Sequence, residues 1–502
     1  MEKSLKVLQV GKEDFRTKYE IPAELAWETV TPGEDWKMQE EKYDIVWISS
    51  PITAKDGSQI SKIGNDYRIF YNITDELKNC EVFARLRRLR IAQSILPERN
   101  QEIINLLPMA FYDGQYGDKS PIKDCEIRNE NAHVVFRGNH QLVLKGDYGT
   151  TFQQILVWRY GIVMNRDRAL ELWLEYSIDG DLELEMVVRG YQSGSVSELV
   201  RIWRFDKELK EPWAVILSEK ERNLTLSVSL RARGSGCLRI GPLHHRQSRM
   251  GTAVFLPGGK KQQDKNREEF FSLLEYGDRK PPLNVYFSGY RTAEGFEGYY
   301  MMKNLGSPFL LLGDPRLEGG AFYIGSEEYE QKIRETIQKA LDRLEFTKDQ
   351  LILSGISMGS FGAAYYSADF EPHSVILGKP LMNLGNVAAN ERYLRPGGFA
   401  TSLDLLLKET GGLGPEEIEQ LNQKLWRKFD KAGFENTDFV ISYMKHDDYD
   451  PTGYQDLLNH LATSKANIYG KGIIGRHNDN TSAVVEWFIK RYQRIMERSF
   501  PK

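Results

Sequence analysis

The sequence has few cysteines and no long apolar run. Its three cysteines, Cys80, Cys125 and Cys237, are odd in number and spaced unlike any metal-ligand motif. This pattern argues against a disulfide framework or a zinc site and fits a reducing compartment. The start of the chain shows no apolar segment of the signal-peptide type, and no apolar run reaches the length of a membrane span. We therefore expect the protein to stay on the side of the membrane where it is made, and any membrane contact to go through partners or a surface.

A strong charge of one sign is also missing. The 502 residues include 67 basic and 71 acidic side chains, with a formal net charge of -4, so nothing indicates a nucleic-acid binder. Gly11 follows the first expected strand but does not begin a Gly-x-Gly-x-x-Gly pattern. We therefore infer no dinucleotide site, and we expect neither a bound cofactor nor a metal.

Hydrophobic periodicity divides the chain into four stretches. Residues 1–118 mix strand and helix patterns and predict a small α/β region, whereas residues 119–256 alternate with period two and predict an antiparallel β-sandwich. Residues 257–267 are polar and contain glycine, which predicts a linker over residues 257–279. Residues 280–502 alternate strands with helices, which predicts an α/β domain with a parallel sheet and active residues at the carboxyl ends of its strands. Residues 400–430 are expected to be a helical insertion, either a lid over the site or ordinary packing.

Three local features of the first half are an arginine cluster, a glycine-centred turn pattern and a set of tryptophans. Four arginines within residues 85–90 are expected on a solvated helix face, with an anionic docking face as the alternative. Residues 178–182, with Gly180 at the centre, predict a hairpin turn. Core packing is the simpler interpretation for the tryptophans of the sandwich, and a glycan-stacking platform is the alternative; these residues are Trp158, Trp173, Trp203 and Trp213.

The most informative stretch is Leu351–Gly362. An apolar run leads into Gly-Ile-Ser-Met-Gly at residues 355–359, and small residues follow, so the pattern predicts a strand, a sharp turn and a helix. This is the pattern of the nucleophile elbow of α/β-hydrolases, with Ser357 at the tip of the turn. The flanking glycines are expected because a Cβ would collide there. The Met358 N–H at the helix N-terminus would be the first oxyanion donor.

An elbow serine needs a base later in the chain, after an acid. His477 is the predicted base because it lies in a Gly-rich loop just before the final helix pattern. His373 follows the elbow helix too closely, and His460 lies in an amphipathic helical stretch where a packing role is expected. A solvated loop histidine is the alternative interpretation of His477.

The acid is expected after the strand that precedes this loop. Residues 439–444 have a strand pattern, and Asp447 is the first carboxylate beyond it, with Asp448 and Asp450 in reserve. Its role would be to orient the imidazole and stabilise the imidazolium. The second oxyanion donor is expected to be a backbone N–H near Ser288 or Gly289, in the loop after an earlier strand.

Three motifs carry a resemblance to a known family, namely residues 355–360, 443–451 and 475–480. Together with the β-rich middle and the length, they make the chain similar to the second accessory secretory protein of the accessory Sec system, which exports serine-rich repeat adhesins in Gram-positive cocci. The resemblance implies that a triad of serine, acid and histidine O-acetylates N-acetylglucosamine on the adhesin while the protein also supports export. Matched position by position, the triad falls on Ser357, Asp447 and His477, although some members have Glu at the acidic position.

The same resemblance implies the partners and the location. The expected partners are the adhesin, the sibling accessory secretory proteins and the accessory SecA motor, with the protein in the cytoplasm at or near the inner face of the membrane. An acetyl donor is required, and the sequence does not identify it. The residues do not distinguish transfer from hydrolysis, so a carbohydrate esterase is one alternative. A non-catalytic export adaptor on a hydrolase fold is the other.

Overall fold

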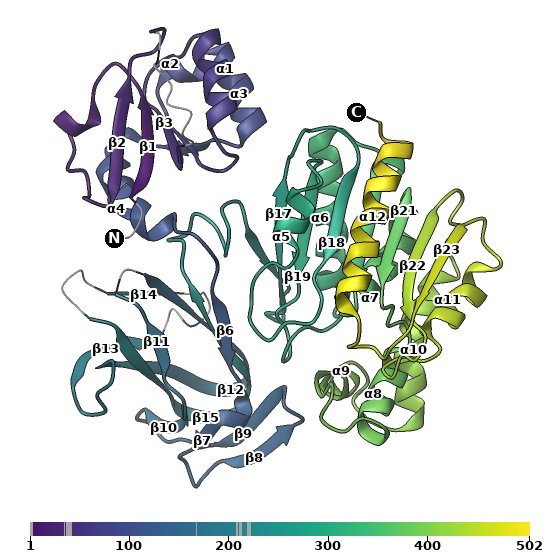
Figure 1. Cartoon of the computed structure of the whole chain (residues 1–502). Helices are drawn as coiled ribbons and strands as arrows, with labels where there is room; N and C mark the ends of the chain where they lie inside the picture. The colour runs from purple at the N-terminus through teal and green to yellow at the C-terminus, as the bar shows by residue number, and fades with distance from the viewer. Residues whose placement is uncertain are drawn as a thin grey trace. The chain divides into compact units, whose positions relative to one another are not determined.

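The computed structural model describes residues 4–34, 36, 43–166, 168–206, 209, 213–217 and 222–501. The chain forms two compact units, the first made of residues 1–114 and 248–258 and the second of residues 115–247 and 259–502. The strands of the described residues belong to three sheets (Figure 1). None of the described helices combines the length and the apolar character that a membrane crossing needs.

The first unit contains a parallel sheet with helices on both faces. Its strand order is β2-β1-β3-β4-β5, and the strands are β1 (Leu5–Val10), β2 (Leu25–Val30), β3 (Ile45–Ile48), β4 (Ile69–Asn72) and β5 (Gln93–Ile95). Neighbouring strand residues point to opposite faces, so Val7 and Leu8 belong to two different apolar clusters. The helices are α1 (Ala54–Ile63), α2 (Asp75–Lys78), α3 (Glu81–Arg90) and α4 (Asn100–Ala110).

The arginine cluster of this unit lies on α3. Arg85, Arg87 and Arg88 are exposed, and Arg90 pairs with Asp66 at 3.1 Å. This is the solvated helix face that the sequence predicted.

The second unit begins with a ten-stranded antiparallel sheet. Its strands are β6 (Gly117–Ser120), β7 (Cys125–Ile127), β8 (His133–Arg137), β9 (Gln141–Asp147), β10 (Gln153–Trp158), β11 (Ile162–Met164), β12 (Ala169–Gln192), β13 (Leu199–Phe205), β14 (Trp213–Ile216) and β15 (Leu224–Gln247). The predicted sandwich is corrected in one respect: all ten strands belong to one hydrogen-bonded sheet, and one large apolar cluster takes residues from most of these strands. The two 24-residue strands β12 and β15 hold it together, because most of the shorter strands pair with one of them.

The hairpin turn predicted at residues 178–182 is wrong. These residues lie within β12, where Gly180 pairs with Gly236 of β15. A Cβ on Gly234 would lie 1.9 Å from the carbonyl oxygen of Asp181. The glycines therefore mark a close approach of two long strands, which a sequence pattern does not distinguish from a turn.

The tryptophans of this sheet are core residues where the structure describes them. Trp158 and Trp173 are 2 % and 1 % exposed, and Trp203 is partly buried against the apolar cluster that contains Trp158. The side chain of Trp213 lies outside the described residues. A stacking platform made of Trp158 and Trp173 is therefore wrong, because neither ring reaches the surface.

The rest of the second unit is built on an eight-stranded sheet. Its order is β16-β17-β19-β18-β20-β21-β22-β23, with the first two strands antiparallel and the others parallel. The strands are β16 (Lys260–Gln263), β17 (Glu269–Glu275), β18 (Leu283–Phe287), β19 (Phe309–Gly313), β20 (Leu351–Ile356), β21 (Ser374–Gly378), β22 (Asp438–Met444) and β23 (Asn467–Ile473). The linker predicted at 257–279 is therefore wrong, because β16 and β17 belong to this sheet. The residues of β16 are polar because β16 is an edge strand of the sheet.

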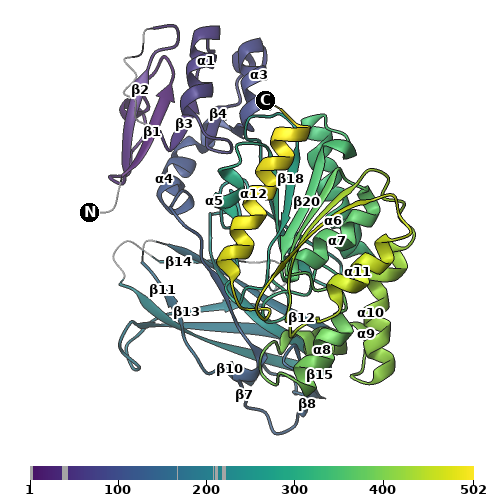
Figure 2. The same ribbon diagram turned by 45° about the vertical axis from the view of Figure 1, so that its right-hand side comes forward.

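Helices cover both faces of this sheet. Tyr286 and Phe287 are neighbours in β18 and point to opposite faces. Tyr286 contacts Phe488 of α12 with ring centroids 6.2 Å apart, whereas Phe287 stacks on Tyr366 of α7 at 5.7 Å. Figure 2 shows α12 and α7 beside the central strands. The helices are α5 (Tyr299–Lys303), α6 (Glu327–Leu344), α7 (Met358–Phe370), α8 (Leu384–Tyr393), α9 (Thr401–Thr410), α10 (Pro415–Phe429), α11 (Gly453–Leu461) and α12 (Thr481–Ser499).

The helical insertion is longer than the sequence predicted. It lies between β21 and β22 and consists of α8, α9 and α10, so it begins before residue 400. The Asn386 N–H of α8 donates to the Asn422 side chain of α10 at 3.0 Å, which helps to hold the helices together.

Candidate active site

Ser357 lies at a sharp turn between β20 and α7. β20 ends at Ile356, α7 begins at Met358, and Ser357 has φ 56° and ψ -121°, a conformation that L-residues rarely adopt. A Cβ on Gly355 would lie 2.1 Å from the Gly359 carbonyl oxygen, and one on Gly359 would lie 2.0 Å from that of Phe287. The glycines are therefore needed for the close approach, and the turn has the geometry of a nucleophile elbow.

Ser357, His477 and Asp447 form one chain of hydrogen bonds. The Ser357 Oγ lies 2.8 Å from His477 Nε2, and His477 Nδ1 lies 2.8 Å from Asp447 Oδ2. The His477 and Asp447 side chains are only 2 % and 7 % exposed. The structure thus brings together the three residues singled out in the sequence, each at the carboxyl end of a parallel strand. In this arrangement the imidazole can take the serine proton while the carboxylate stabilises the resulting positive charge.

The three aspartates after β22 have different environments. Asp447 Oδ1 accepts the N–H groups of Tyr449 and Asp450 at 2.9 and 3.1 Å, which leaves Oδ2 for His477. Asp448 does not reach the imidazole; its Oδ1 accepts the backbone N–H of His477 at 3.0 Å, and its Oδ2 pairs with Arg395 at 3.0 Å. Of these two residues, Asp447 contacts the imidazole and Asp448 contacts the backbone of the histidine loop.

Asp450 serves the fold of the insertion. It is 3 % exposed and accepts the backbone N–H groups of Met382 and Asn383 at 2.7 and 2.8 Å. Burial raises the pKa of this carboxyl above its ordinary value. Its two hydrogen bonds to these backbone groups fix the start of α8.

Two other histidines after Ser357, His373 and His460, have different neighbours. His373 Nδ1 lies 2.7 Å from Ser374 Oγ at the start of β21, the amino end of that strand. His460 stacks on Trp426 at 4.0 Å and contacts Asp430 at 2.5 Å.

The two loop amides expected near the oxyanion are both donated elsewhere. The Ser288 N–H donates to the Leu312 carbonyl at 2.9 Å, which extends the pairing of β18 with β19 by one bond. The Gly289 N–H donates to the Glu297 carboxylate at 2.5 Å. Met358, by contrast, is the first residue of α7, and the first amides of a helix have no acceptor within it.

Sequence reasoning missed three side chains that shelter His477. The Tyr449 ring lies against the imidazole with centroids 4.3 Å apart, and Phe399 stacks on Tyr449 at 5.4 Å. The Arg395 guanidinium lies 3.5 Å from the Tyr449 ring centroid. Arg395 and Phe399 come from the segment between α8 and α9, and nothing in the local sequence connects this segment with the histidine loop.

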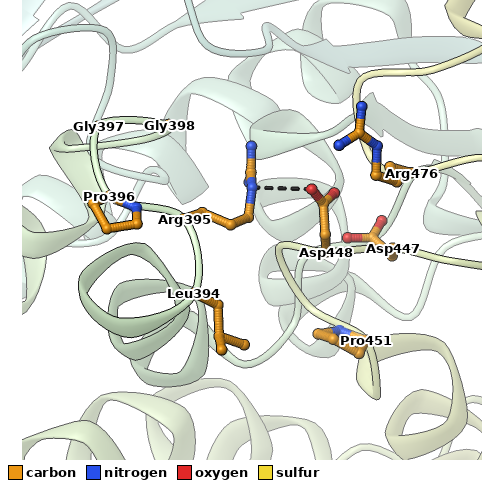
Figure 3. Close-up of a pocket in the computed structure, with 9 residues that line it drawn as sticks. All are labelled: Leu394, Arg395, Pro396, Gly397, Gly398, Asp447, Asp448, Pro451 and Arg476. Atoms are coloured by element: carbon orange, nitrogen blue, oxygen red, sulfur yellow. Dashed lines mark ion pairs between the residues drawn. The ribbon is translucent and has the colours of Figure 1, made fainter.

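A cavity of about 680 Å³ opens beside Asp447 and Asp448 (Figure 3). Figure 3 shows the Arg395 side chain reaching toward Asp448, with Asp447 and Arg476 close by. The helical insertion therefore borders this cavity through residues 394–398, which follow α8. The lining residues are Leu394, Arg395, Pro396, Gly397, Gly398, Asp447, Asp448, Pro451 and Arg476.

Fold and site together define a class of protein. The parallel strands, the serine turn after β20, the aspartate after β22 and the histidine after β23 are those of an α/β-hydrolase-like protein with a Ser-His-Asp site. The chain belongs to the accessory Sec system GspB-transporter family, whose profile matches residues 5–502. This is the family of the second accessory secretory protein, so the resemblance seen in the sequence is confirmed.

Relatives match the chain over its whole length. An accessory Sec system protein of Staphylococcus aureus (strain NCTC 8325 / PS 47) is 39 % identical, and the match covers 100 % of this chain and 98 % of the relative. One from Streptococcus gordonii is 38 % identical over 100 % of this chain and 99 % of the relative. A solved structure titled as the Glycosylation Associate Protein (Gap123) complex from Streptococcus agalactiae contains a chain that is 38 % identical. It superposes with a TM-score of 0.93 over 100 % of this chain and 99 % of that one.

Proposed function

We propose that the protein is a serine-dependent O-acetyltransferase of the accessory Sec system, which acetylates N-acetylglucosamine on serine-rich repeat adhesins and also supports their export. The observation that carries the proposal is the hydrogen-bonded chain from Asp447 through His477 to Ser357 at a strained turn. Strain, burial and three aligned side chains are the features of an activated nucleophile.

The first half of the reaction acetylates Ser357. His477 Nε2 takes the Ser357 Oγ proton as the oxygen attacks the acetyl carbonyl, and Asp447 stabilises the imidazolium. The Met358 N–H stabilises the oxyanion of the tetrahedral intermediate. The intermediate collapses as the donor's leaving group departs with the proton from His477, which leaves an acetyl ester on Ser357.

The second half transfers the acetyl group. A sugar hydroxyl attacks the ester carbonyl while His477 takes its proton, and Ser357 leaves with that proton restored. The cavity beside Asp447 and Asp448 suits a hydroxyl-rich acceptor, because the carboxylate of Asp448 and the guanidinium groups of Arg395 and Arg476 line it. Water in place of the sugar would make the same residues a carbohydrate esterase.

We propose the partners from family membership. The Streptococcus agalactiae relative is described as part of a complex, which supports assembly of this chain with the sibling accessory secretory proteins. The adhesin substrate, the accessory SecA motor and a cytoplasmic position at or near the inner face of the membrane are further parts of this proposal. The acetyl donor is a co-substrate and not a resident cofactor.

The test compares Ser357→Ala with the unaltered protein in cells that carry the adhesin. Mass spectrometry of the adhesin glycans measures their acetyl content, and export is measured in parallel. We expect loss of the acetyl groups with export retained. Ser197→Ala is the matched control, because Ser197 is an exposed serine between β12 and β13. It should change neither the acetyl content nor the export.

Two results would contradict the proposal. Unchanged acetylation in the Ser357→Ala cells would leave the elbow as a scaffold and favour the adaptor. More acetyl groups on the adhesin glycans of the Ser357→Ala cells than on those of cells with the unaltered protein would indicate an esterase.

A further inference from the structure

The loop that follows β18 lies directly against the serine turn. A Cβ on Gly289 would lie 3.2 Å from the carbonyl oxygen of Ile356, the residue before Ser357. A Cβ on Gly359 would lie 3.1 Å from the Ser288 carbonyl oxygen. Ser288 and Gly289 therefore border the serine turn, and Tyr290 is the next residue of the loop.

The backbone amides of this loop have identifiable acceptors, with one exception. The N–H groups of Ser288 and Arg291 donate to the carbonyls of Leu312 and Gly319 at 2.9 and 3.1 Å. The Gly289 N–H donates to Glu297 at 2.5 Å. Among the described residues, none accepts the N–H of Tyr290, which lies between Gly289 and Arg291.

The Glu297 carboxylate is held from a second side. Tyr286, which is 2 % exposed in β18, faces this carboxylate, and burial together with the negative charge of Glu297 raises the pKa of the Tyr286 hydroxyl well above its ordinary value. Glu297 thus bridges a buried strand residue and the loop amide of Gly289. A fixed bridge is a means of holding a loop in one conformation.

The segment that carries Glu297 is hydrogen-bonded to the antiparallel sheet and to the residues just before its first strand, all within the second unit. The Phe296 N–H donates to the Gln115 side chain at 2.9 Å, and the Gln115 amide donates to the Phe296 carbonyl at 2.8 Å. Glu294 is 4 % exposed; it accepts from Arg246 of β15 at 2.5 Å and contacts His244 of the same strand. Buried charges paired in this way hold their elements firmly, because separating them leaves an unpaired charge in the interior.

We propose that Glu297 is a positioning residue of the oxyanion site. By accepting the Gly289 N–H it fixes the loop so that the adjacent Tyr290 N–H is the second oxyanion donor, opposite the Met358 N–H. The antiparallel sheet supports this geometry through Gln115 and Glu294. The inference rests on the proposed acyl chemistry of Ser357.

The test measures acylation of Ser357 with p-nitrophenyl acetate as the probe, using the full-length protein. Glu297→Ala removes the bridge and should lower the rate constant of the p-nitrophenol burst by about 10-fold or more, since loss of one oxyanion donor costs on the order of 10²-fold. KM should stay unchanged. Glu297→Gln keeps an oxygen that can accept the Gly289 N–H and should stay within about 3-fold of the unaltered protein.

Two further variants separate positioning from folding and from charge. Gln115→Ala removes the support of Phe296 and should lower the burst rate without a change in KM, which keeps the inference testable if Glu297→Ala does not fold. Glu318→Ala removes an exposed carboxylate near Tyr290 and should leave the rate unchanged. Thermal unfolding of each variant checks the fold.

The outcomes distinguish this inference from the proposed function. A normal burst in Glu297→Ala and Gln115→Ala overturns the inference alone. A faster burst in Glu297→Ala also overturns it, because the carboxylate would then be blocking Gly289 as the true donor. Absence of a Ser357-dependent burst in the unaltered protein refutes the proposed function and this role of Glu297 with it.

Discussion

Asp447 and Asp448 are chain neighbours, yet they contact different parts of His477. Asp447 contacts the imidazole, and Asp448 accepts the backbone N–H of the same residue. We expect Asp447→Ala to lower acyl transfer by roughly 10³- to 10⁴-fold, because the imidazole loses both its orientation and its counter-charge. Asp448→Ala should cost about 10-fold, because only the placement of the loop changes. Steady-state rates of acetyl release from a chromogenic ester measure both, and equal losses or the reverse order would contradict the assignment of the acid.

At the scale of an element, the packing of α7 on β18 sets the elbow. The space at Gly359 is closed by the Phe287 carbonyl oxygen, 2.0 Å from where a Cβ would lie, and backbone cannot move aside as a side chain can. We expect Gly359→Ala to lower the free energy of unfolding by about 1–3 kcal/mol and to displace Ser357. Urea unfolding measures the loss. Gly433→Ala is the matched control, since its nearest atom lies 4.0 Å away, and a Gly359 variant as stable as this control would show that the approach is not limiting.

At the scale of the whole molecule, ion pairs join the helical insertion to the edge of the eight-stranded sheet. Glu268, between β16 and β17, contacts Arg316 at 2.7 Å and Lys408 of α9 at 2.5 Å. Burial alone would raise the pKa of Glu268, but Lys408 and Arg316 outweigh it and lower the pKa from 4.5 to about 2. The lowered pKa means that the stabilisation is complete above about pH 4.5 and is lost as the pH falls toward 2.

This gives a pH-dependent prediction. Glu268→Gln should be less stable than the unaltered protein at pH 7, by at most about 3 kcal/mol, and the difference should shrink between pH 4.5 and 2. Urea unfolding at pH 7, 4.5 and 3 measures it. Glu335→Gln removes an exposed partner of Lys339 on α6 and should change little at any of these pH values. A difference at Glu268 that does not vary with pH would contradict the ion pair.

Local patterns in the sequence were sufficient for much of the site. The Gly-x-Ser-x-Gly spacing predicts the elbow because strand, turn and helix are specified within a dozen residues, and the structure has a sharp turn there. Asp447 and His477 could be selected because each follows a strand pattern, and the carboxyl ends of parallel strands meet at one edge of a sheet. The catalytic role of the three residues stays a prediction.

Other features depend on residues far apart in the chain, and no local pattern contains them. The polar residues of β16 hid a strand of the sheet, because an edge strand tolerates polar side chains, and the linker predicted from them extended over β17. Gly180 indicated a turn, but its partner strand lies more than fifty residues later and makes it a point of close contact. The acceptors of the Ser288 and Gly289 amides, and the packing of Tyr449 on His477, likewise depend on long-range contacts.

The sequence by itself therefore determined the family, the elbow and the chain order of serine, aspartate and histidine, because these are written in short motifs. Only the tertiary structure decided which amides remain for an oxyanion, which tryptophans are buried and how Glu297 reaches Gly289. A hydrogen-bond acceptor and a packing partner are chosen by distance in space, and that distance is fixed only when the strands have taken their places in the sheets.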